Sequence, residues 1–139
     1  MPAFNTLDDR ERNLVVTGQQ RQITHDLTIA NGAAATAWVA THGALALSVD
    51  MPASWTSADL TIELSNDGGT TNLGKLRDAA GDPVRLVIGT TSLGCPTLSP
   101  DKGWGFGART HFRLVSTDKA DETDENQGGA RSLTAYLLL

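Results

Sequence analysis

The residue types that most often carry chemistry in proteins are few in this chain and lie far apart. None of the three histidines, His25, His42 and His111, has a second histidine or an acid four residues away, as a helical zinc motif requires. The single cysteine, Cys95, has no base among its immediate neighbours and cannot form a disulfide within the chain. A lone thiol of this kind usually packs as a small hydrophobic side chain. We therefore expect neither a bound metal nor a nucleophilic cysteine.

Three other patterns resemble functional motifs but lack the spacing that the chemistry needs. The acidic stretch 118–125 has neither the central glycine nor the flanking helices of a calcium-binding EF-hand. Gly103, Gly105 and Gly107 alternate with aromatic residues instead of forming a strand-to-helix phosphate cradle, and no G-x-S-x-G nucleophile motif is present. The sequence therefore predicts a protein that is not an enzyme and that uses no cofactor.

Composition and charge exclude further classes of protein. The 139 residues fit one domain, and a hydrophobic content of 40% with only 5% aromatic residues favours a thin aliphatic core. The net charge of -5, without a basic stripe, argues against a nucleic-acid partner. No apolar run reaches the roughly 18–20 residues of a membrane-spanning helix, and the N-terminus lacks the apolar centre of a signal peptide. We expect a soluble protein without a membrane partner, assembled in a reducing cytoplasm.

Short alternating runs separated by turn residues indicate an all-β fold. The runs that we expect to be strands are 21–29, 33–40, 44–51, 60–65, 73–78, 84–88, 111–116 and 132–139. We expect Leu45, Leu47, Val49 and Met51 to face the core together, and residues 89–103 to form a loop. About eight strands with turns every 8–12 residues are typical of an antiparallel β-sandwich, and the sequence favours its jelly-roll version.

Two polar segments depart from this pattern. Residues 1–20 are interpreted as an N-terminal arm that precedes a sandwich domain of residues 21–139, and we expect the arm to bind neighbouring subunits through its charges. The charged residues of the arm are Asp8, Asp9, Arg10, Glu11 and Arg12. Residues 117–129 hold one lysine against five acids, a net charge of -4, so we expect a solvated and mobile hairpin tip there.

Several short motifs follow one another along the second part of the chain. Residues 51–56 read M-P-A-S-W-T, residues 65–68 read S-N-D-G, residues 106–116 read F-G-A-R-T-H-F-R-L-V-S, and residues 126–134 read N-Q-G-G-A-R-S-L-T. They resemble M-P-x-x-W-T, S-x-D-G, F-x-G-x-R-Y-[IL]-R-L-x-S and Q-x-A-x-R-x-[LF]-x-[LV], which occur in this order in small β-sandwich virion proteins of tailed bacteriophages. The chain departs from that pattern at Asn72-Leu73, where an aromatic residue is expected, and in the longer 89–103 segment.

The resemblance covers roughly residues 40–139 and implies a virion structural protein with no catalytic residues to carry over. Our first hypothesis is a head decoration (cement) protein that binds the outer capsid lattice and stabilises the head. Its expected partners are the major capsid protein and further copies of the chain, either as a homo-oligomer or as neighbours on the virion. The alternative is a carbohydrate-binding or adhesin module on the virion, in which Trp55, Trp104 and Tyr136 would stack on sugar rings. A tail or connector component is a third possibility, which the sequence does not separate from the first.

Overall fold

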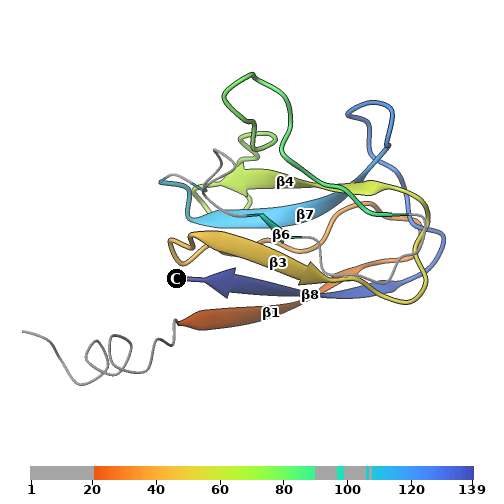
Figure 1. The fold of residues 1–139 in the computed structure, drawn as a ribbon, viewed down its shortest axis with the longest axis horizontal. Coiled ribbons are helices and arrows are strands. Elements are labelled where there is room, and N and C mark those ends of the chain that lie inside the picture. Colours follow the sequence, from red (N-terminus) through yellow and green to blue (C-terminus); the bar gives the residue numbers. More distant parts are fainter. Residues whose placement is uncertain (1–20, 90–96, 99–105, 107) are drawn as a thin grey trace, which may run out of the picture.

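The alternating runs form eight short strands in the computed structural model, which describes residues 21–89, 97–98, 106 and 108–139 (Figure 1). The strands are β1 (Gln22–Ile29), β2 (Val39–Ala40), β3 (Ala46–Asp50), β4 (Asp59–Ser65), β5 (Arg85–Leu86), β6 (Thr97–Leu98), β7 (His111–Thr117) and β8 (Arg131–Leu138). None of the described residues belongs to a helix long and apolar enough to cross a bilayer. The predicted arm, residues 1–20, lies outside the described residues.

The strands are arranged in two four-stranded sheets, in the order β1-β8-β3-β6 and β2-β7-β4-β5. The pairs β1·β8, β2·β7, β3·β6 and β4·β5 are all antiparallel. This is the pairing of a long hairpin, four strands against four, that has been rolled into two facing sheets, as in a jelly roll. The predicted all-β antiparallel sandwich, with about eight strands and a jelly-roll order, is confirmed.

The core between the sheets is built from aliphatic side chains at alternate strand positions. Leu47 of β3, Ile62 of β4 and Leu137 of β8 are almost completely buried, and Phe112 of β7 is the largest fully buried side chain. Burial of each such side chain contributes about 1.5–3 kcal/mol. The apolar C-terminal strand β8 lies between β1 and β3, as its sequence predicts for a strand inside a sheet.

Four local predictions are wrong. The run 73–78 is not a strand, because only isolated bridges, from Lys75 to Glu63 and from Arg77 to Pro83, pair it with its neighbours. Leu45 does not join Leu47 and Val49 in the core: it precedes β3 at the end of the sheet and is 57% exposed. The run 33–40 is not one strand, because only a bridge at Ala35 and the two residues of β2 pair with β7. The segment 89–103 is not entirely a loop, since β6 pairs with β3, while residues 90–96 and 99–103 lie outside the described residues.

The acidic stretch is also different from the free hairpin tip that the sequence predicts. It is a hairpin, because Thr117 bridges to Asp124 and Asp118 N donates to Thr123 O at 2.9 Å. It is not free of the domain, because Arg85 beside it donates to the backbone oxygens of Asp118, at 2.9 Å, and of Asp121. Cationic side chains from other strands therefore supply the contacts that the stretch cannot supply by itself.

A further contact joins Lys119, the one cation of the stretch, to a buried carboxylate of the domain. Asp59, at the start of β4, is only 5% exposed. Its Oδ1 atom accepts a hydrogen bond from Lys119 Nζ at 2.7 Å, and its Oδ2 atom lies 3.5 Å from Arg85 Nη1. Lys119 also donates to Ile88 O, and Ile88 N donates to Asp59 Oδ1 at 3.1 Å. The hairpin is thereby fixed to the ends of β4 and of the segment after β5.

We predict that Lys119→Met lowers the free energy of unfolding by about 1–3 kcal/mol, because a buried carboxylate loses its nearest cation. The matched control is Glu122→Gln in the same hairpin, where the ion pair with Arg77 is about half exposed on both sides. Such exposed pairs contribute about 0–1 kcal/mol. Urea unfolding of both variants measures the difference, and equal losses would contradict the role given to Asp59.

Candidate functional site

Three of the four motif segments named above meet at one polar cluster, at the end of the sandwich where β8 begins. We call Thr56, Ser116, Gln127 and Arg131 the Gln127 cluster. Gln127 is only 1% exposed. Its Oε1 atom accepts from Thr56 N at 2.8 Å and from Arg131 Nε at 3.1 Å. Its Nε2 atom donates to Thr56 O at 3.1 Å and to Ser116 Oγ at 2.8 Å. Three of the four motif segments, all except 65–68, thus contribute a member.

The backbone of Gln127 extends the cluster to a fourth segment. Gln127 N donates to Ala33 O at 2.8 Å, and Gly32 N donates to Gln127 O at 2.9 Å. A glutamine amide has two N–H donors and an oxygen that accepts two hydrogen bonds, and all of them are used here. The cluster therefore joins the connections β1–β2, β3–β4 and β7–β8 and presents no unused amide group to a ligand.

The S-N-D-G motif forms the turn after β4. Ser65 Oγ donates to Asp67 Oδ1 at 2.8 Å, and the same carboxylate oxygen accepts from Thr71 N at 2.8 Å. Gly68 and Gly69 have φ angles of 71° and 99°, which favour glycine. A Cβ atom on Gly69 would lie 2.2 Å from Trp38 Cδ1, so the turn packs directly against this indole ring.

Arg113, in the motif at residues 106–116, also makes contacts inside the fold. Arg113 and Glu63 face each other across β7 and β4, with Arg113 Nη2 at 2.6 Å from Glu63 Oε1. The guanidinium of Arg113 also lies 4.7 Å from the centre of the Trp38 ring, which is a cation–π distance. The motif residues that the structure describes in these places therefore make contacts that stabilise the sandwich.

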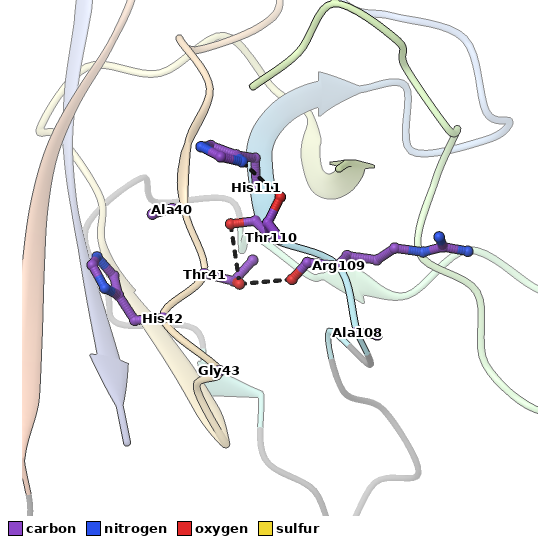
Figure 2. Close-up of a pocket in the computed structure, with 8 residues that line it drawn as sticks. All are labelled: Ala40, Thr41, His42, Gly43, Ala108, Arg109, Thr110 and His111. Carbon is purple, nitrogen blue, oxygen red and sulfur yellow. Dashed lines mark hydrogen bonds between the residues drawn. The ribbon is translucent and has the colours of Figure 1, made fainter. Parts of the chain in front are cut away.

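An open hollow of about 480 Å³ lies at the other end of the sandwich (Figure 2). It is lined by Ala40, Thr41, His42, Gly43, Ala108, Arg109, Thr110 and His111. Thr41 Oγ1 donates to Arg109 O at 2.8 Å, and the Thr110 hydroxyl lies 2.8 Å from His111 Nδ1. In the described part of the chain no carboxylate contacts His111, so this hydroxyl–imidazole pair lacks the orienting third group of a nucleophilic triad. Figure 2 shows Arg109 and His42 pointing away from each other.

Two of the three histidines come together although they are distant in sequence. The rings of His25 and His42 stack with centroids 5.6 Å apart, and His25 also meets Phe112 edge-on at 6.4 Å. His25 Nε2 lies 3.1 Å from Ala40 O, so this nitrogen carries the proton and donates. This contact connects β1 of one sheet to β2 of the other. Among the described residues there is no group of three or more His, Cys, Asp or Glu side chains that could hold a metal.

Of the predicted sugar-stacking residues, the structure describes Trp55 and Tyr136, which lie apart from each other. Trp55 is partly buried against the core, and its Nε1 atom donates to Ala58 O at 3.1 Å. Tyr136 lines a smaller depression of about 190 Å³ on the outer face of β8 and β3, and its hydroxyl donates to Asp50 Oδ2 at 2.9 Å. Trp55 precedes Thr56, which contacts Arg131 at the start of β8. Tyr136 lies five residues further along this strand, about 16 Å from Arg131. Trp104 and the arm residues 8–12 lie outside the described residues.

We predict that Gln127→Met, which keeps the side-chain volume but removes the amide, lowers the free energy of unfolding by about 2–4 kcal/mol, because several buried polar groups lose their partners. The control is Asn126→Ala at the neighbouring exposed position, where a change within about 0.5 kcal/mol is expected. Thermal and urea unfolding measure both variants. A Gln127→Met protein as stable as the control would show that the cluster does not hold the sandwich together.

A second prediction concerns the turn after β4 in acid. Hydrogen bonds lower the pKa of Asp67 from 3.8 to about 2, mainly from the Thr71 amide and then from the Thr71 and Ser65 hydroxyls. A carboxylate with a lowered pKa stabilises the folded turn above pH 3.8, and this contribution disappears as the pH falls toward 2. The amide proton shift of Thr71, followed by NMR, should therefore titrate with a midpoint near 2. A midpoint at the ordinary value of 3.8 would contradict the hydrogen-bonded turn.

Comparison with known proteins adds weak structural similarity. No family model matches the chain, and no curated protein matches it. The crystal structure of the SPBc2 prophage-derived protein YomS is similar over 87% of this chain and 97% of its own, with a TM-score of 0.37 and 12% sequence identity.

Proposed function

We propose that the chain is a virion structural protein of a tailed bacteriophage, and specifically a head decoration protein that binds the outside of the capsid and bridges neighbouring capsid subunits. It acts in the virion by binding, without catalysis. The major capsid protein is its main partner. The motif resemblance supports the bacteriophage class, and the jelly-roll order supports a structural or binding role, since this architecture is frequent in capsid and lectin domains.

The polar groups of the motif segments support a protein that functions as a rigid body. Gln127, Ser116, Asp67 and Arg113 all make hydrogen bonds or ion pairs inside the domain. A catalytic site requires a nucleophile, a base and an orienting group within reach of one another, and the contacts of these residues are directed to the fold instead. These contacts therefore hold the domain in one conformation, which can bind to the capsid lattice as a rigid body.

The observation that carries the proposal is the exposed side chain of Leu45, at the end of the sandwich where β1 begins. Leu139 N donates to Arg21 O at 2.9 Å, which places the C-terminus beside the start of β1, as Figure 1 shows. Leu45 is 57% exposed at the same end, and its amide donates to Leu138 O at 2.7 Å. An exposed leucine at the end where β1 begins fits the apolar centre of an interface, and the charged residues that precede β1 in the sequence fit its polar surround.

We predict that Leu45→Ser weakens binding to phage heads that lack the protein by about tenfold or more, since one well-buried leucine contributes on the order of 1.4 kcal/mol to an interface. The matched control is Val87→Ser, which changes an apolar side chain that is 71% exposed after β5 in the other sheet. Co-sedimentation with heads measures the affinity, and survival of the heads at raised temperature measures protection.

Removal of residues 1–20 tests the arm in the same assay. We expect the shortened protein to stay folded but to bind and protect heads less well than the full chain, because it lacks the charged residues that are proposed to contact neighbouring subunits. Equal affinities of the full chain, Leu45→Ser and the shortened protein would contradict the proposed surface. Binding to tails or to a glycan array, with none to heads, would replace the proposal by the tail or the adhesin alternative.

A further inference from the structure

We infer that β1 is a homodimerisation edge: two copies of this chain pair their β1 strands antiparallel, so that their β1-β8-β3-β6 sheets join into one continuous sheet. The inference concerns the free protein, and it neither needs the capsid nor depends on the proposed function.

The four sheet edges of the sandwich differ greatly in length. The edge strands are β1 and β6 in one sheet and β2 and β5 in the other. The strands β2, β5 and β6 each have two residues, whereas β1 has eight and pairs with β8 along its whole length. Figure 1 shows β1 as the outermost strand of its sheet. Among the described strands, β1 is therefore the edge strand that is long enough to pair with an added strand over its full length.

The register of β1 and β8 shows which of its backbone groups point away from the sheet. Arg21 O accepts from Leu139 N at 2.9 Å, so Arg21 directs its backbone groups toward the β8 side. In an antiparallel pair this direction alternates from residue to residue. Gln22, Thr24, Asp26 and Thr28 therefore direct both N–H and C=O outward. No described residue makes a backbone hydrogen bond to them on that side.

The edge has few of the usual features that prevent strand addition. Exposed edge strands in soluble proteins are commonly interrupted by a bulge, a proline or a lysine. The register of β1 with β8 is continuous and therefore has no bulge, and residues 22–29 contain neither proline nor lysine. Asp26 is the one side chain in the strand that carries a full charge at neutral pH.

A second copy fits this edge because β1 is complementary to itself. A two-fold axis at His25 places Thr24 opposite Asp26 of the second copy and Gln22 opposite Thr28. All the outward backbone groups then form hydrogen-bonded pairs, giving about eight hydrogen bonds. A Thr24 hydroxyl can donate to the carboxylate opposite it, and the two Asp26 residues are diagonal to each other rather than directly opposite. If the two-fold axis passed through residue 26 instead, the two Asp26 carboxylates would lie opposite each other, and fewer of the outward backbone groups would be paired.

The first test measures the mass of the full chain by sedimentation equilibrium between about 1 µM and 1 mM, the range of weak association. We expect a reversible rise from 14.7 kDa to twice that mass. Thr24→Pro removes an outward N–H without removing a hydrogen bond to β8, so it should weaken the dimer by about tenfold or more while the domain stays folded. Thr24→Ala keeps the N–H and is the matched control.

The second test determines the register by disulfide formation in a Cys95→Ser background. Thr24→Cys mixed with Asp26→Cys should form a mixed disulfide, because directly paired Cα atoms are about 5.5 Å apart. Either variant alone should form far less, since diagonal neighbours are about 7–8 Å apart, too far for a disulfide.

Each of three results would overturn the inference. The first is a chain that stays monomeric across the range, and the second is a Thr24→Pro protein that dimerises as well as the control. The third is a disulfide that forms equally in all mixtures. Dimerisation that survives Thr24→Pro but is lost on removal of residues 1–20 would assign the contact to the arm instead.

Discussion

The sandwich depends on one buried amide that connects segments far apart in the sequence. Gln127 uses both amide hydrogens and its oxygen to hold Thr56, Ser116 and Arg131, while its backbone pairs with residues 32 and 33. In a low-dielectric interior such a network is stabilising only when every member has a partner. The connections at this end of the jelly roll are therefore fixed as one unit, and the strands that leave it are positioned relative to one another.

This constraint is important because the hydrophobic core is modest. The chain has only 5% aromatic residues, so the facing sheets are joined by aliphatic side chains around Phe112. Polar contacts outside that core then connect the remaining parts. Asp59 and Lys119 fix the acidic hairpin, Glu63 and Arg113 join β4 to β7, and His25 joins the two sheets through Ala40. The contacts of Gln127 with Thr56 and Ser116, by comparison, join residues from three of the motif segments.

Local periodicity was sufficient to predict most strands, their inward faces and the sandwich class, because alternation depends only on neighbouring residues. The long-range polar contacts could not be predicted in this way. Nothing near residues 118–125 indicates that Arg85 and Asp59 bind them, and a high local charge alone predicts a solvated loop. Leu45 was wrongly assigned to the core because the alternation of apolar and polar residues begins before β3 does. At this position, just ahead of the strand, the facing sheet no longer covers the side chain. The packing of Trp38 against Gly69 was also not predicted. The glycine pair 68–69 indicates a tight turn, but nothing in the sequence near it indicates which side chain packs on that turn.

The two ends of the sandwich therefore have different roles in this account. The Gln127 cluster closes one end internally, while the other end carries Leu45, the C-terminus and the start of β1, from which residues 1–20 extend in sequence. A density map of the intact phage particle tests this assignment most directly. The account predicts that the domain lies on the outer surface of the head. The end that carries Leu45 should face the major capsid protein, and the end closed by the Gln127 cluster should face solvent. A domain located in the tail, or one docked through its Gln127 end, would contradict it.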